Sequence, residues 1–336
     1  MRIVTQKEMK EVELLAQKNF QFPEKLIIEN VALHGAKTIV EKISSHLEVG
    51  ELIFLVGKGN NGGVGLGIAR HLAAMGIESR AFILFEENQL SQECREQLAT
   101  AQAFGVRISF INDISALEAY FQQTSAPKII VDAIFGTGVR LPLSNFLYDV
   151  IHFINDYKTF TVSLDIPTGV EGDSGLVQGN AIEADLTLAV GFPKLGYYQG
   201  DGPRLVGEVE IIPGGFPSSL VFEGGDKFLL DIDEVSFLPK QRNRFADKKV
   251  FGHTLVIGGS HGLTGALVMS STAALKVGAG LVTAVTWETQ YQELILYLRI
   301  PPLLMFVPFL ISQQKYPYWF LHHDVHHQCR RLQIFL

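Results

Sequence analysis

Apolar and polar residues follow one another along this chain in the pattern of a parallel α/β protein. Segments 7–17 and 25–43 place apolar residues three and four positions apart, which predicts two helices within residues 5–46. Beyond them, short apolar runs alternate with helical stretches. Seven strands are predicted, at 52–57, 79–85, 106–111, 128–136, 160–167, 185–192 and 206–213. This alternation indicates a three-layer α/β fold, with a mostly parallel, Rossmann-like sheet and helices on both faces.

The pattern changes after residue 220. A Gly- and Ser-rich joint at 214–228 is followed by a second strand–glycine loop–helix pattern at 252–285. From residue 299 onward no convincing period remains, although the tail contains the cluster HHDVHH (322–327), which is either a metal ligand set or incidental. We therefore expect domains at 1–220 and 226–298 and an irregular tail at 299–336.

Composition and charge narrow the class of protein. The 336 residues are 47% hydrophobic and 19% charged, as in a folded globular protein. The net charge of −7 is opposite in sign to the charge excess that is typical of nucleic-acid-binding proteins. The two cysteines form no CxxC pair, which fits a reducing cytoplasm. The N-terminus lacks an apolar signal core, and the apolar stretch 298–311 is too short and proline-rich to span a bilayer. We expect a cytoplasmic protein without membrane partners.

Ligands of such sheets bind beyond the carboxyl ends of the strands, so the loop GKGNNGG (57–63) is the first candidate. Its glycines would let backbone amides approach an anion, and the helix that follows adds a positive dipole. It lacks both GxGxxG and GK[ST], which disfavours dinucleotide and P-loop fingerprints. Asn60 and Asn61 offer amide oxygens for a hard cation. A tight turn with both asparagines in the left-handed conformation is the competing interpretation.

Two further strand ends carry carboxylates. Asp132 lies inside an apolar run, so it must be solvated, paired or metal-bound, or else it caps the following loop. Asp165 ends another strand and is a candidate general acid/base, with Thr168 as a further oxygen ligand. Together the three loops supply Asn61, Asp132 and Thr168 as hard oxygen donors. Lys194 and Gly196 are interpreted as loop positions.

Four motifs, in this order and spacing, resemble the NAD(P)H-hydrate epimerases of the YjeF N-terminal domain family. They are GKGNNGGVGLGIARHL, VDAIFGTGVRLP, SLDIPTGVEGDSG and DLTLAVGFPKLG, and the resemblance covers residues 1–220. Residues 244–285 resemble the opening of the ADP/ATP-dependent NAD(P)H-hydrate dehydratase, a ribokinase-like fold. The chain thus looks like a bifunctional nicotinamide nucleotide repair protein whose second half stops early.

The resemblance implies epimerisation of the R and S forms of NAD(P)H hydrated at C6 of the nicotinamide ring. It implies Asp165 as the catalytic residue, a potassium ion held by Asn61, Asp132 and Thr168, and a homodimer. Substrate binding is assigned to Asn60, Asn61, Gly62, Gly63, Val64, Gly136, Thr137, Gly138, Val139, Arg140, Leu141, Pro142 and Asp165.

The chain departs from the family pattern in places. Thr168 replaces a serine and keeps the oxygen, whereas Val64 replaces the aspartate of NNGGDG. That loss removes a charge and a candidate cap at the helix start, so weaker substrate binding is expected. The dehydratase half is expected to be inactive, with ADP or ATP required only if it were complete. An inactive epimerase fold that serves as a binding or scaffold protein is the alternative, and a sugar or hydroxymethylpyrimidine kinase is disfavoured.

Overall fold

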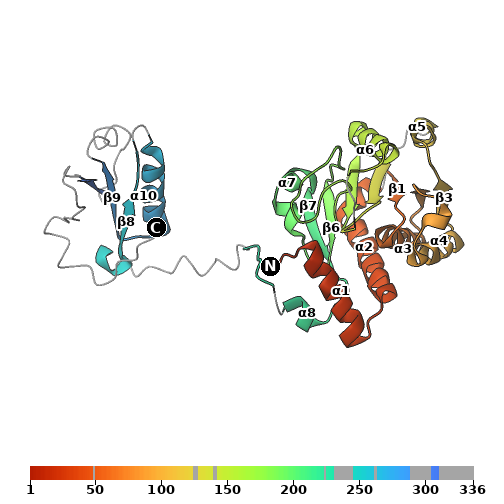
Figure 1. Ribbon diagram of the computed structural model, residues 1–336, viewed down its shortest axis with the longest axis horizontal. Helices are drawn as coiled ribbons and strands as arrows, with labels where there is room; N and C mark the ends of the chain where they lie inside the picture. The colour runs from red at the N-terminus through yellow and green to blue at the C-terminus, as the bar shows by residue number, and fades with distance from the viewer. Residues whose placement is uncertain are drawn as a thin grey trace. The chain divides into compact units, whose positions relative to one another are not determined.

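The computed structural model describes residues 1–47, 50–123, 128–138, 142–222, 225–230, 245–260, 263–287 and 304–309. The chain divides into two compact units, Met1–Leu229 and Leu230–Leu336 (Figure 1). Each unit contains its own parallel sheet, and the candidate chemistry lies in the first.

The first unit is built on seven strands that all pair in parallel. Their order across the sheet is β3-β2-β1-β4-β5-β6-β7. The strands are β1 Glu51–Val56, β2 Ser79–Ile83, β3 Arg107–Phe110, β4 Lys128–Ala133, β5 Phe160–Leu164, β6 Leu186–Val190 and β7 Glu208–Ile212. All seven predicted strands are confirmed. The order reverses between β1 and β4, and the carboxyl ends of strands at such a switch point form the ligand crevice of open α/β sheets.

Helices cover both faces of this sheet, which completes the three predicted layers (Figure 1). The helices are α1 Gln6–Phe20, α2 Glu24–Leu47, α3 Asn60–Ala74, α4 Gln92–Ala103, α5 Ile114–Gln123, α6 Asn145–Tyr157, α7 Gly202–Leu205 and α8 Ser218–Phe222. Side chains of β1 alternate between the faces, so Phe54 packs with α2 and α3 whereas Leu55 packs with α5 and α6. Buried strands with two covered faces explain why these apolar runs are nearly continuous.

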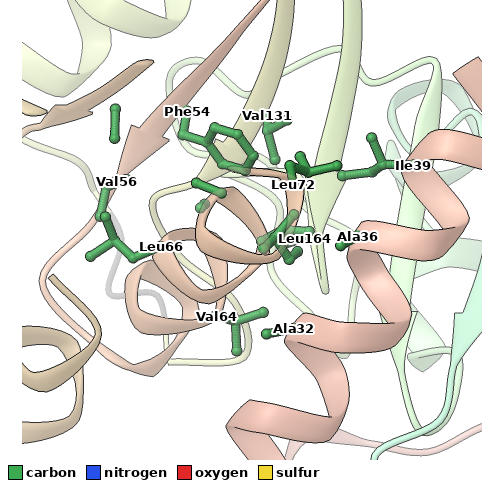
Figure 2. Packing of buried hydrophobic residues seen from close by; sticks show 14 of the residues in the cluster. Ala32, Ala36, Ile39, Phe54, Val56, Val64, Leu66, Leu72, Val131 and Leu164 are labelled. Carbon is green, nitrogen blue, oxygen red and sulfur yellow. The ribbon is translucent and has the colours of Figure 1, made fainter. Parts of the chain in front are cut away.

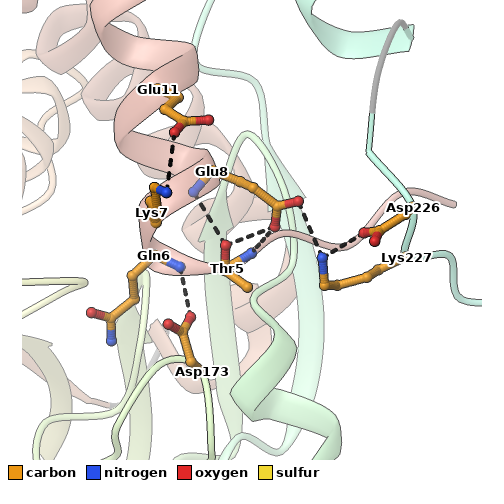
Figure 3. Close-up of polar contacts among 8 residues, drawn as sticks. All are labelled: Thr5, Gln6, Lys7, Glu8, Glu11, Asp173, Asp226 and Lys227. Carbon is orange, nitrogen blue, oxygen red and sulfur yellow. Dashed lines mark hydrogen bonds and ion pairs between the residues drawn. The ribbon is translucent and has the colours of Figure 1, made fainter.

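Helix α1 is fixed at its first turn by polar contacts (Figure 3). Thr5 and Glu8 form a capping box: the Glu8 N–H donates to Thr5 Oγ1 at 3.2 Å, and the Thr5 N–H donates to Glu8 Oε2 at 2.7 Å. The Gln6 N–H donates to Asp173 Oδ1 at 2.6 Å, which ties the helix to the loop after β5. Lys227 Nζ approaches Glu8 from the end of the unit at 3.2 Å. These contacts set where α1 starts and which loop it lies against.

The second unit repeats the strand–helix–strand pattern. It comprises β8 His253–Ile257, α10 Gly265–Val277, β9 Leu281–Trp287 and β10 Leu304–Phe309, and its sheet order is β10-β9-β8 with parallel pairs. The prediction of an irregular tail from residue 299 is wrong for 304–309. This short apolar run gains its pairing from β9, a contact distant in sequence that no local period reveals. The HHDVHH cluster lies outside the described residues. In the described part of the chain, no helix is long and apolar enough to cross a membrane.

The capping box yields a stability prediction. Replacing Thr5 by alanine removes the acceptor for the Glu8 N–H, so we expect Thr5→Ala to lower the free energy of unfolding by about 1 kcal/mol. Lys7→Ala is the matched control, since the Lys7 side chain is 85% exposed and should change stability by less than about 0.5 kcal/mol. Urea unfolding followed by circular dichroism measures both. Equal stabilities for the two variants would contradict the capping assignment.

Candidate active site at the carboxyl edge of the sheet

Asp132 lies at the end of β4 and is completely buried. Its carboxylate accepts four hydrogen bonds, from Ser163 Oγ at 2.9 Å, the Thr168 N–H at 2.8 Å, Thr168 Oγ1 at 2.7 Å and the Ile134 N–H at 3.2 Å. Burial raises the pKa of this carboxyl, and the hydrogen bonds oppose that rise. These bonds agree with the interpretation in which Asp132 bonds to loop residues. It joins the ends of β4 and β5 to the loop that holds Thr168.

Asp165 directly follows β5 and has φ of 64°, one of three non-glycine residues in the described chain with positive φ. The Ile166 N–H donates to the Leu164 carbonyl at 2.8 Å, which closes a three-residue turn around Asp165. The neighbouring strand β6 ends in the same way around Gly191, whose φ is 68°. Glycine adopts this conformation freely, whereas an aspartate does so at a cost of about 1–3 kcal/mol. Such strain at a strand end marks a position of functional interest.

The conformation of Asp165 is held by several surrounding bonds. Lys194 Nζ forms an ion pair with Asp165 Oδ1, which also accepts the Val190 N–H at 3.3 Å. The Asp165 N–H donates to the Leu188 carbonyl at 2.9 Å, and the hydroxyl of Tyr197 donates to the carbonyl of Asp165. Burial, followed by the charge of Asp165, raises the pKa of Tyr197 well above its ordinary value, so this hydroxyl keeps its proton. Asp165 is therefore fixed at both its backbone and its carboxylate.

Lys194 is the buried partner of Asp165, whereas the sequence indicated an ordinary loop position. Its side chain is fully buried, and its ammonium group also donates to the Val190 carbonyl at 2.9 Å. A buried lysine requires a counter-charge, and Asp165 supplies it. The available signal was the sequence GFPKLGYY, in which a single lysine stands among apolar residues.

The second oxygen of Asp165 faces the loop after β4. A Cβ atom placed on Gly136 would lie 2.9 Å from Asp165 Oδ2 and 3.4 Å from Asn61 Oδ1. Within the described part of the chain, no hydrogen bond to Oδ2 is found. Asn61 Nδ2 donates to the Leu164 carbonyl at 3.2 Å, which turns its oxygen toward the same place. The three predicted loops thus converge, and Gly136 packs so closely against Asp165 Oδ2 that a side chain at this position would crowd the carboxylate.

The glycine loop before α3 differs from the expectation in detail. Asn60 and Asn61 are the first residues of the helix and Gly59 is its N-cap, so the left-handed turn interpretation is wrong. A Cβ on Gly62 would lie 2.1 Å from the Gly57 carbonyl oxygen, so this glycine allows α3 to pack on the end of β1. Asn60 Nδ2 donates to Glu24 at the start of α2. The helix N-terminus nevertheless points toward this edge of the sheet, as predicted.

Val64 is not at the helix start. It lies in the second turn of α3, is 7% exposed, and packs opposite Ala32 of α2 in the larger apolar cluster (Figure 2). The expectation that this position is a helix cap is therefore wrong, because Gly59 has that role. The valine contributes apolar packing between two helices.

The other predicted positions vary in exposure. Gly63 is buried, Thr137 is half-buried, and Gly138 and Pro142 are exposed. Val139, Arg140 and Leu141 lie outside the described residues. No group of three or more His, Cys, Asp or Glu side chains placed for a metal ion occurs among the described positions. Cys94 is buried, and burial raises the pKa of its thiol to about 12, which fits the ordinary thiol predicted from sequence.

Comparisons with known proteins relate this architecture to one family. Residues 24–196 match the family model described as YjeF-related protein N-terminus. The chain is 34% identical to the bifunctional NAD(P)H-hydrate repair enzyme Nnr of Moorella thermoacetica, over 84% of this chain and 54% of that protein. It is also 34% identical to the NAD(P)H-hydrate epimerase of Rhodopirellula baltica, over 65% and 86% respectively.

A solved structure shows the same fold. The crystal structure of yeast ynu0 aligns with a TM-score of 0.53 and 20% identity, covering 63% of this chain and 87% of that one. The chain spans about half the length of the bifunctional relatives that it matches.

The hydrogen bonds of Thr168 yield a second stability prediction. Thr168→Val keeps the shape but removes the hydroxyl that donates to Asp132 and accepts the Phe135 N–H at 3.2 Å. Because both partners then lack a bond in a buried place, the free energy of unfolding should fall by about 1–3 kcal/mol. Thr168→Ser keeps the hydroxyl and should lose only about 0.8 kcal/mol for the methyl group. Urea unfolding of both variants measures whether the hydroxyl stabilises the fold. A serine variant as unstable as the valine variant would contradict this role of the hydroxyl.

Proposed function

Because the chain belongs to the family described as YjeF-related protein N-terminus, we propose that it interconverts the R and S forms of hydrated NAD(P)H. The observation that carries the proposal is the carboxylate of Asp165. One of its oxygens is held by Lys194 and Val190, while the other faces the glycine of the neighbouring loop. A rigidly held carboxylate at the meeting point of three strand-end loops suits a residue that exchanges protons with a ligand.

The substrate is proposed to lie between two loops of this edge. Its anionic dinucleotide part lies against residues 60–64, where the N-terminus of α3 favours negative charge. Its nicotinamide end reaches the loop 136–142, so that the hydrated carbon comes beside Asp165. Val139, Arg140 and Leu141 complete the proposed binding set.

The reaction requires a proton to leave one atom and return to another. The C6 hydroxyl is bonded to the carbon next to the ring nitrogen, so two routes connect the epimers. In one, the hydroxyl accepts a proton, leaves as water, and water returns to the opposite face while losing a proton. In the other, the hydroxyl loses its proton and the ring nitrogen gains one as the C6–N bond breaks, and both transfers reverse when the ring closes on the other face. Asp165 is the proposed acid/base in both, and Lys194 balances its charge.

A potassium ion is proposed at Asn61, Asp132 and Thr168. The set fits chemically, because all three side chains present oxygen and only one carries a charge, as suits a hard monovalent cation. Asp132 and Thr168 are in direct contact. Asn61 lies beside Gly136, and the N–H of Phe135, the residue before Gly136, donates to Thr168 Oγ1. When bound, the ion would supply positive charge that favours an anionic substrate.

Asp165→Asn tests the acid/base assignment. Asparagine tolerates positive φ and can still accept the Val190 N–H, but it leaves the buried Lys194 without its counter-charge. Stability should therefore fall, and the rate is compared at a temperature where circular dichroism shows that the variant is folded. We expect the rate of epimer exchange to fall by about 10²–10⁴-fold, measured by chromatographic separation of the R and S forms. Asp156→Asn, at a carboxylate with 71% side-chain exposure on α6, should keep the wild-type rate. Full activity in Asp165→Asn, with circular dichroism unchanged, would falsify the assignment.

The proposed ion site predicts cation-dependent stability. At ten times its dissociation constant, potassium should stabilise the native state by about 1.4 kcal/mol, which is a few degrees in Tm. Melting in KCl and in LiCl of equal ionic strength measures the difference. In Thr168→Val the difference should vanish. Identical melting in the two salts for the wild type would rule out a potassium site of useful affinity.

A further inference from the structure

Glu13 on α1 is a half-buried carboxyl group close to the proposed acid/base, and neither the fold nor the proposed mechanism uses it. Burial and then the charge of Asp165 raise its pKa to about 7, with Glu24 adding to the rise and Lys194 and Lys10 opposing it. These are the charged groups that face Glu13 from its own helix, from the start of α2 and from the ends of β5 and β6.

The backbone sets the position of Glu13 independently of its charge. The Val4 N–H donates to the Pro193 carbonyl at 3.0 Å, and the Leu195 N–H donates to the Val4 carbonyl at 2.9 Å. The chain that leads into α1 is therefore bonded on both sides of Lys194. The contact between the Gln6 N–H and Asp173 fixes the first turn of α1 on the loop after β5 (Figure 3).

The face of α1 that bears Glu13 is also established by packing. A Cβ on Gly191 would lie 3.6 Å from Met9 Cε, so Met9 covers the turn at the end of β6. Met9 and Val12 pack in one apolar cluster with Phe192. Glu13 is one helical turn beyond Met9 and hence on the same side of the helix. Its carboxyl group is thus carried toward the segment that contains Asp165 and Lys194.

We propose that Glu13 is a positioning residue for the Asp165–Lys194 pair, and that its protonation state sets the charge of the site and thereby the pH range of catalysis. The three groups together carry one negative charge when Glu13 is ionised and none when it is protonated. An ionised Glu13 adds a negative charge beside the pair and attracts the ammonium of Lys194. Both states of Glu13 are populated near neutral pH, so the net charge of the three groups changes within this range.

The proposal rests on the proposed epimerase function, and the pH profile of epimer exchange tests it. In the wild type we expect the rate to change between pH 6 and pH 8 with an inflection near pH 7. In Glu13→Gln the side chain stays neutral, so the variant should keep the low-pH rate of the wild type across this range. Glu13→Asp should restore an inflection. Glu11→Gln, on the exposed side of the same helix, is the matched control and should leave the profile unchanged. An unaltered inflection in Glu13→Gln overturns the proposal.

A measurement without substrate separates this proposal from the function on which it rests. In protein labelled with ¹³C at glutamate carboxyls, the Glu13 signal should titrate near pH 7. Asp165→Asn should lower that midpoint, because a negative charge is removed, and Lys194→Met should raise it. The proposed coupling between Glu13 and the Asp165–Lys194 pair is overturned if Glu13 titrates near the ordinary value of about 4.3. It is also overturned if the midpoint is the same in both variants as in the wild type. A wild type without exchange activity but with this titration would contradict the proposed function alone.

Discussion

The carboxylate of Asp132 is the interaction on which the carboxyl edge of the sheet depends. It lies at the end of a central strand, with no access to water, and all its hydrogen bonds come from the protein. A buried charge without partners would be very costly, so these bonds are required for the fold. Three of them come from Ser163 of β5 and from Thr168 in the loop beyond it, which brings the segments on either side of Asp165 against β4. The site is built outward from this one buried group.

The same edge stores backbone strain at the residue proposed to do chemistry. Two adjacent strands end in equivalent turns, one around Gly191 and the other around Asp165. A glycine would be the easier choice at both places, and the aspartate persists because Lys194, Tyr197 and the β6 backbone all bond it. A binding module or scaffold would gain nothing evident from a strained carboxylate paired with a buried lysine. This comparison favours the catalytic interpretation over the scaffold alternative.

Sequence patterns predicted the first unit well because its strands are buried on both faces and therefore nearly continuous in apolar residues. The four motifs also indicated the family to which the chain belongs. The helix start at Asn60 was misjudged, since an asparagine pair is equally typical of a turn. Lys194 was missed because its partner lies 29 residues away and on another strand end. The strand at 304–309 was missed for the same reason, since its pairing with β9 is not local.

Glu13 is a further residue near the site that the sequence pattern alone did not identify. Its helix pattern identifies it as one polar residue among many on α1, and only the packing of α1 on the loop before Lys194 brings it near the site. Three carboxylates thus differ in their places at this edge: Asp132 is buried and joins the strand ends, Asp165 has a strained backbone, and Glu13 is half-buried on the covering helix.

Epimer exchange by the purified chain decides whether this edge of the sheet is an active site. A single epimer of hydrated NADH is incubated with the protein, and the other epimer is followed by chromatography against a buffer blank. We expect the two forms to reach equilibrium much faster with the protein than in the blank. Exchange no faster than in the blank, by protein shown to be folded and supplied with potassium, would contradict it.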